Sequence, residues 1–85
     1  MRASISVPTF PAMRGRDMLA VLLRRPLEYG VVRQNGSHRQ LRAAGRPPLT
    51  FAFHDNASIP PSLVRKILMS DIGLDEDEAH RILKG

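Results

Sequence analysis

The pattern of hydrophobic and polar residues along the chain predicts one helix, then three short strands, then two further helices. Residues 16–25 have a helical pattern, because their large apolar residues recur at a spacing of four: Met18, Leu19, Leu22 and Leu23. Pro26 disfavours helical backbone in the residue before it, so we expect the helix to end there. Residues 30–34, 38–43 and 49–54 are predicted to be strands, and the last of them, LTFAFH, alternates as a half-buried strand does.

Turn residues separate the predicted strands. Asn35-Gly36 is the strongest hairpin signal in the chain, and we expect a type I′ turn there, in which both central residues take positive φ. The segment AGRPP, which begins at Ala44, predicts the next turn. The three strands should therefore form one antiparallel sheet.

A second helix is expected to begin at Pro60 and Pro61 and to end before Gly73, which suits the position just after a helix end. Its apolar face consists of Leu63, Val64, Ile67, Leu68 and Ile72. Asp75 should cap the last helix, with Glu78 three residues later completing a capping box. Negative charge at a helix start also favours the helix dipole, so this acidic segment has a structural explanation.

The element order α-β-β-β-α-α predicts an α+β two-layer sandwich, in which helices cover one face of the sheet. Residues 1–12 are expected to be a flexible N-terminal arm, and residues 13–85 a single domain. Strand alternation requires Leu41, Leu49 and Phe51 to face the helices. The other face of the sheet then carries polar side chains: His38, Gln40, Arg42, Thr50 and, at the strand end, His54. The antiparallel register should bring the two histidines together, whereas a slip of one residue would move His38 to the helix side.

Composition points to an anionic partner. The 85 residues include 13 Lys and Arg against 8 Asp and Glu, a net charge of +5, and residues 75–78 hold four of the acids. Nucleic acid or an acidic protein is therefore the expected partner. With one Tyr and no Trp, the chain has few aromatic side chains on which bases could stack, so a broad base-stacking platform is not expected. The absence of Cys excludes disulfides, thiolate zinc sites and cysteine nucleophiles.

No apolar run approaches the roughly 18 residues of a membrane helix, and the first ten residues contain no signal-peptide core. We therefore expect a cytoplasmic protein with no membrane contact. Three widely spaced histidines do not form a convincing zinc site, and no phosphate-binding glycine loop is present, so no metal or cofactor is expected.

The polar sheet face suits RNA cleavage without a metal. Imidazole exchanges protons near neutral pH, and arginine binds phosphate and stabilises charge that develops on it. A base would take the proton of a 2′-hydroxyl, and an acid would protonate the leaving oxygen. A surface histidine is more often a solvated residue, however. A non-catalytic RNA-binding domain and a module that binds an acidic protein are therefore the alternatives.

The ordered segments GRDMLAVLL, YGVVRQNGSHRQLR, LTFAFHDN, PPSLVRKILMSDIGL and DEAHRIL resemble the HicA (YcfA-like) toxin family over about residues 14–84. The resemblance implies a double-stranded-RNA-binding-domain-like α-β-β-β-α sandwich with an additional C-terminal helix. It implies an mRNA interferase, an endoribonuclease that cleaves single-stranded mRNA and inhibits translation. It also implies a HicB-type antitoxin that covers the active face and links the toxin only indirectly to DNA.

In this resemblance, the histidine of the GSH motif corresponds to His38 and is the expected catalytic residue. The family's strand-terminal histidine corresponds to His54, which strand pairing makes our candidate for a second proton-transfer group. The residues expected to bind and position RNA are Arg33, Ser37, Arg39, Gln40 and Arg42. Many relatives have a second histidine where this chain has Arg39.

Overall fold

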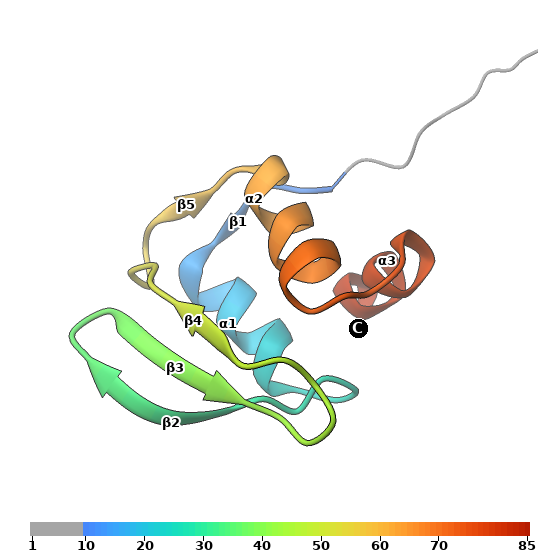
Figure 1. Cartoon of the computed structure of the whole chain (residues 1–85). Helices are drawn as coiled ribbons and strands as arrows, with labels where there is room; N and C mark the ends of the chain where they lie inside the picture. The colour runs from blue at the N-terminus through green and yellow to red at the C-terminus, as the bar shows by residue number, and fades with distance from the viewer. Residues whose placement is uncertain (1–9) are drawn as a thin grey trace, which may run out of the picture.

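A three-stranded antiparallel sheet packed against helices forms the body of the protein in the computed structural model, which describes residues 10–85 (Figure 1). The elements in chain order are β1 (Met13–Arg14), α1 (Gly15–Leu23), β2 (Gly30–Asn35), β3 (His38–Arg42), β4 (Leu49–Phe51), β5 (Ser58–Ile59), α2 (Pro61–Arg65), the π-helix η1 (Lys66–Asp71) and α3 (Glu76–Lys84). The sheet order is β2-β3-β4, and β1 pairs with β5 separately. The predicted α+β architecture, compatible with a double-stranded-RNA-binding-domain-like α-β-β-β-α fold, is confirmed.

One hydrophobic core joins the sheet to the helices. Leu41, Leu49 and Phe51 are buried, as the alternation predicted, and they belong to the same cluster as Met18 of α1 and Leu68 of η1. The end of α1 is also tied to α3, because the Arg24 guanidinium donates to the carbonyl oxygen of Ile82 at 2.9 Å. A cation at the last carbonyls of a helix satisfies acceptors that have no partner within the helix.

The β2–β3 hairpin turns one residue later than predicted. Asn35 pairs with His38, so the two central residues are Gly36 and Ser37. Of these two residues, Gly36 alone has positive φ, at 63°. A glycine with positive φ at the first central position is the requirement of a type II′ turn, so the predicted type I′ turn is wrong. Residues 36–37 therefore form a two-residue loop, which we call the hairpin tip.

A bulge in β2 decides which side chains share a face. Val31 and Arg33 are separated by two positions, and a regular strand would place them on the same face. The register shifts between them, so that Val31 pairs with Leu41 while Arg33 pairs with Gln40. The extra residue of a bulge changes the face of the sheet toward which the side chains beyond it point. Arg33 consequently lies on the same face as Gln40.

The third strand is shorter than predicted: β4 ends at Phe51 rather than His54. The chain turns instead, with the amide of Ala57 donating to the carbonyl oxygen of His54 at 3.0 Å. This turn packs on the start of α1, where the amide of Gly15 donates to Ala57 at 2.8 Å and that of Arg16 donates to Asp55 at 3.0 Å. Gly15 allows the approach, because a Cβ there would overlap the carbonyl oxygen of His54.

The C-terminal helices follow the predicted signals with one difference. The helix predicted to run unbroken up to Gly73 is divided into α2 and η1, and Gly73 then takes a φ of 93°. The capping box is confirmed. The amide of Glu78 donates to Asp75 Oδ1 at 2.8 Å, and the amide of Asp75 donates to Glu78 Oε1 at 3.1 Å.

Residues 1–9 of the predicted arm lie outside the described residues. Phe10, which that prediction also placed in the arm, is only 7 % exposed. Its ring stacks on His80 of α3 with 4.4 Å between ring centroids. His80 is accordingly half-buried.

Candidate functional site

Four polar residues of the β2–β3 hairpin line a shallow depression that we call the histidine depression: Arg33, Asn35, His38 and Gln40. They form two cross-strand pairs, because Arg33 pairs with Gln40 and Asn35 pairs with His38. All four are exposed. The hairpin register and the bulge therefore bring three of the predicted site residues together on one face.

Arg42 lies on the same face beyond Gln40. The bulge places Gly30 opposite it, so no side chain from β2 stands across from the guanidinium. Thr50 pairs with Gln40 from the other side and is exposed. Arg42 is thus a second accessible cation on the strand that carries His38.

The histidine depression is chemically suited to a phosphodiester. None of the four described residues that line this depression is acidic. A guanidinium binds phosphate oxygens through paired N–H donors, and a neighbouring imidazole can give or accept a proton. Exposed His38 can reach a group that lies on this face.

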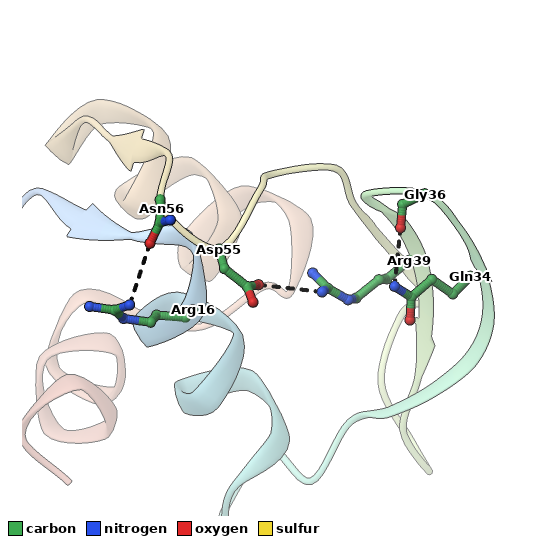
Figure 2. A network of polar contacts seen from close by, with 6 residues as sticks. All are labelled: Arg16, Gln34, Gly36, Arg39, Asp55 and Asn56. Carbon is green, nitrogen blue, oxygen red and sulfur yellow. Dashed lines mark hydrogen bonds and ion pairs between the residues drawn. The ribbon is translucent and has the colours of Figure 1, made fainter.

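The other predicted site residues lie in a second depression, the tip depression, which joins the hairpin tip to the turn after β4. It is lined by Gly36, Ser37, Arg39, His54, Asp55 and Asn56. Arg39 pairs with Phe51, so it lies on the helix side of the strand. Its side chain is only 15 % exposed, and its Nη2 lies 3.4 Å from Asp55 Oδ1. Figure 2 shows the Arg39 guanidinium directed at Asp55.

The two histidines do not meet through strand pairing. The β3–β4 ladder ends with the pair of Arg39 and Phe51. His38 and His54 line different depressions. The register argument for placing them together is wrong, because the strand ends before His54.

Two side chains of the tip depression, those of Asp55 and Asn56, were not predicted as part of the site, and neither was Asn35 of the histidine depression. Asn56 is linked to α1, since Arg16 Nη1 donates to its Oδ1 at 3.4 Å (Figure 2). Asp55 has the charge that Arg39 requires, but the two are 16 positions apart and no local pattern connects them. A turn prediction at residues 54–57 would have been the only available signal.

A metal centre and a membrane-spanning helix are both absent from the described region, residues 10–85. Residues 10–85 contain no group of three His, Asp or Glu side chains that could hold a metal ion. None of the helices described is long and apolar enough to cross a membrane.

Fold and site together define a small α+β protein that presents a histidine and arginines on the open face of a double-stranded-RNA-binding-like sheet. A family model described as the HicA toxin of bacterial toxin-antitoxin matches residues 15–74. That range runs from the first residue of α1 to just beyond η1 and includes both depressions. The chain belongs to the HicA toxin family.

Family membership makes the protein a toxin of a bacterial toxin–antitoxin system, with an antitoxin as its partner. Neither the curated proteins nor the solved structures include a match to this chain.

Proposed function

We propose that this toxin is an mRNA interferase, a metal-independent endoribonuclease that cleaves single-stranded mRNA and so inhibits translation. One observation carries the proposal: exposed His38 shares a depression with Arg33 and Gln40 on the open face of the sheet. A proton-transfer group beside a phosphate-binding group is the minimum that RNA cleavage needs.

The chemistry follows from this arrangement. His38 takes the proton from a 2′-hydroxyl, the 2′-oxygen forms a bond to the adjacent phosphorus, and the bond from phosphorus to the 5′-oxygen breaks. A second group protonates that 5′-oxygen, which leaves a cyclic phosphate on one product and a hydroxyl on the other. Arg33 and Arg42 bind the non-bridging oxygens, whose negative charge increases in the transition state.

His54 remains our candidate for the second proton transfer, now on the strength of its family position alone. It lines the tip depression rather than the histidine depression. A His54→Ala protein that is folded and cleaves at the full rate would remove His54 from the mechanism and leave the role of His38 intact.

The first test compares wild type with His38→Ala on a long single-stranded RNA in EDTA. We expect wild type to cleave and the variant to lose at least about 100-fold in rate, the scale of one general acid or base. Wild type should leave the same RNA intact when every 2′-oxygen is methylated. Circular dichroism of both proteins is the folding control, and equal cleavage by both would contradict the role of His38.

The alternative is a non-catalytic RNA-binding domain, and one observation weighs against its duplex-binding form. Residues 61–71, which form α2 and η1, carry only the cations Arg65 and Lys66, and Lys66 Nζ lies 3.1 Å from Asp71 Oδ1. Duplex binding through backbone contacts needs accessible cations. Salt-dependent RNA binding by wild type without any cleavage would favour this alternative.

We further propose that the antitoxin is of the HicB type and covers the open face of the sheet, and that any contact with DNA is made through the antitoxin. The support is the exposure of all the polar residues on that face and the +5 charge of the chain. A partner with an acidic surface would associate rapidly with such a face.

A further inference from the structure

One nitrogen of the Arg39 guanidinium is buried without a hydrogen-bond partner among the described residues. Arg39 Nη1 is inaccessible to solvent, and no acceptor among residues 10–85 pairs with it. Buried polar atoms in proteins are nearly always paired, and the cost of leaving one unpaired is greatest for charged groups. The contacts among residues 10–85 therefore leave the Arg39 guanidinium incompletely satisfied.

Asp55 satisfies Arg39 only in part. The single contact, from Nη2 to Oδ1, is 3.4 Å long, whereas charge-assisted bonds of this kind are typically about 2.8 Å. The Asp55 side chain is 60 % exposed. Its backbone is held separately, because its carbonyl oxygen accepts from the amide of Arg16 at 3.0 Å. The carboxylate can therefore turn into solvent without moving the chain.

The other residues of the tip depression supply donors for an anion. Ser37 and Asn56 line it beside Arg39, and Gly36 adds no side chain that would narrow it. Serine hydroxyls, asparagine amides and arginine are the groups that contact phosphate oxygens in protein–nucleic acid complexes. The depression thus combines a fork-shaped cation with neutral donors, which suits a phosphate group.

The depression lies where a bound RNA would continue. His38 and Arg39 are consecutive residues of β3, and their side chains leave the strand on opposite faces. The hairpin tip is only two residues long. An RNA strand that passes around this tip meets the histidine depression on one face and the tip depression on the other.

We propose that the tip depression binds a second phosphate group of the RNA substrate, and that this phosphate displaces the Asp55 carboxylate from Arg39. The inference rests on the proposed ribonuclease function and adds a subsite to it. In the free protein, Asp55 stands where the phosphate binds and weakens non-productive anion binding.

The test is a titration of the full chain with 2′-O-methyl dinucleotides, followed by amide NMR. The probe carries no terminal phosphate, a 5′-phosphate or a 3′-phosphate, and methylation prevents cleavage. We expect one terminal phosphate to raise the affinity of wild type by about tenfold, the scale of one hydrogen bond to a charged group. The added shifts should appear at Ser37, Arg39 and Asn56.

Three variants separate the contributions. Arg39→Gln should abolish the gain from the terminal phosphate, and Asp55→Asn should increase it, because the competing charge is removed. Arg42→Gln is the matched control: it should weaken every probe by the same factor and leave the gain unchanged. If Arg39→Gln does not fold, Arg39→Lys, which keeps the charge but loses the fork, should lose most of the gain.

The outcomes distinguish this subsite from the proposed function. If neither terminal phosphate adds affinity, or if the gain survives in folded Arg39→Gln, the subsite is refuted while RNA cleavage by His38 stands. If the probe without a terminal phosphate shifts no resonance of His38 or Gln40, the proposed RNA site on that face is refuted instead.

Discussion

His38 and Arg39 differ in environment although they are neighbours in the chain. His38 is exposed beside Arg33, while the side chain of Arg39 is mostly buried and faces Asp55. The cause is strand geometry, since successive side chains leave a strand on opposite faces. Substitutions at the two positions should therefore have separable effects, on chemistry at His38 and on substrate affinity at Arg39.

Tyr29 shows how one buried hydroxyl can tie two loops together. The residue is 3 % exposed, and its hydroxyl donates to the carbonyl oxygen of Pro47 at 2.7 Å. Burial raises the pKa of the phenol above its usual 10.0, and the nearby charge of Arg46 opposes that rise in part. The folded protein therefore favours the neutral, hydrogen-bonded form.

Tyr29→Phe should lower the free energy of unfolding by about 1 kcal/mol at neutral pH, because one part-buried hydrogen bond is lost. The contribution of the neutral phenol is fully present below pH 10.0 and is lost as the pH rises through the raised pKa. The difference between wild type and variant should thus shrink above pH 10.0. Urea unfolding at pH 7 and in that alkaline range measures it, and a constant difference would contradict the explanation.

At the scale of elements, the sequence predicted the strands better than it predicted their details. The alternation of Leu49 and Phe51 was sufficient to identify the buried face. The bulge between Val31 and Arg33 was not predictable, because two consecutive valines fit a regular strand equally well. The turn lies one residue later than predicted. Asn35-Gly36 is typical of the centre of a type I′ turn, but Asn35 pairs with His38 and so belongs to the strand.

The candidate site was predictable to a similar extent. Face and register placed His38 and Gln40 correctly on the open face, since both follow from alternation around Leu41. The tip depression was not predictable, because it depends on a contact between Arg39 and the turn at Asp55. The strands β1 and β5 are each two residues long, which is too short for a periodic pattern to predict them.

The capping box of α3 provides a prediction about one element. Asp75→Ala should lower the free energy of unfolding by about 1 kcal/mol, because the amide of Glu78 loses its acceptor. Asp77→Ala is the matched control, since it removes the same charge in the first turn without removing the cap. Thermal and urea unfolding of both variants measure the effect. Equal destabilisation would assign it to charge alone.

At the scale of the whole molecule, charge is distributed unevenly. The acidic first turn of α3 and the arginines of the β2–β3 hairpin belong to different ends of the fold, as Figure 1 shows for the two elements. Two of the hairpin arginines, Arg33 and Arg42, lie on the face that also carries His38, while Arg39 lies on the helix side. We expect the proposed acidic partner to approach the face that carries Arg33, Arg42 and His38.

Hydrogen–deuterium exchange of the toxin alone and in complex with its antitoxin tests the proposed coverage. We expect slower exchange across residues 33–42 in the complex and little change in residues 76–84. The complex should also fail to cleave RNA that the free toxin cleaves. Protection confined to α3, with the hairpin unchanged, would place the antitoxin elsewhere.

Gly15 has a consequence for the mutational tolerance of the protein. The carbonyl oxygen of His54 occupies the space that the first side-chain carbon would need, and that carbon is common to all the other amino acids. Position 15 therefore accepts no conservative replacement, although its residue takes part in no chemistry. A one-carbon change at the start of the first helix would be transmitted directly to the turn that holds Asp55, and a random mutagenesis screen should identify this position as sensitive as readily as it identifies His38.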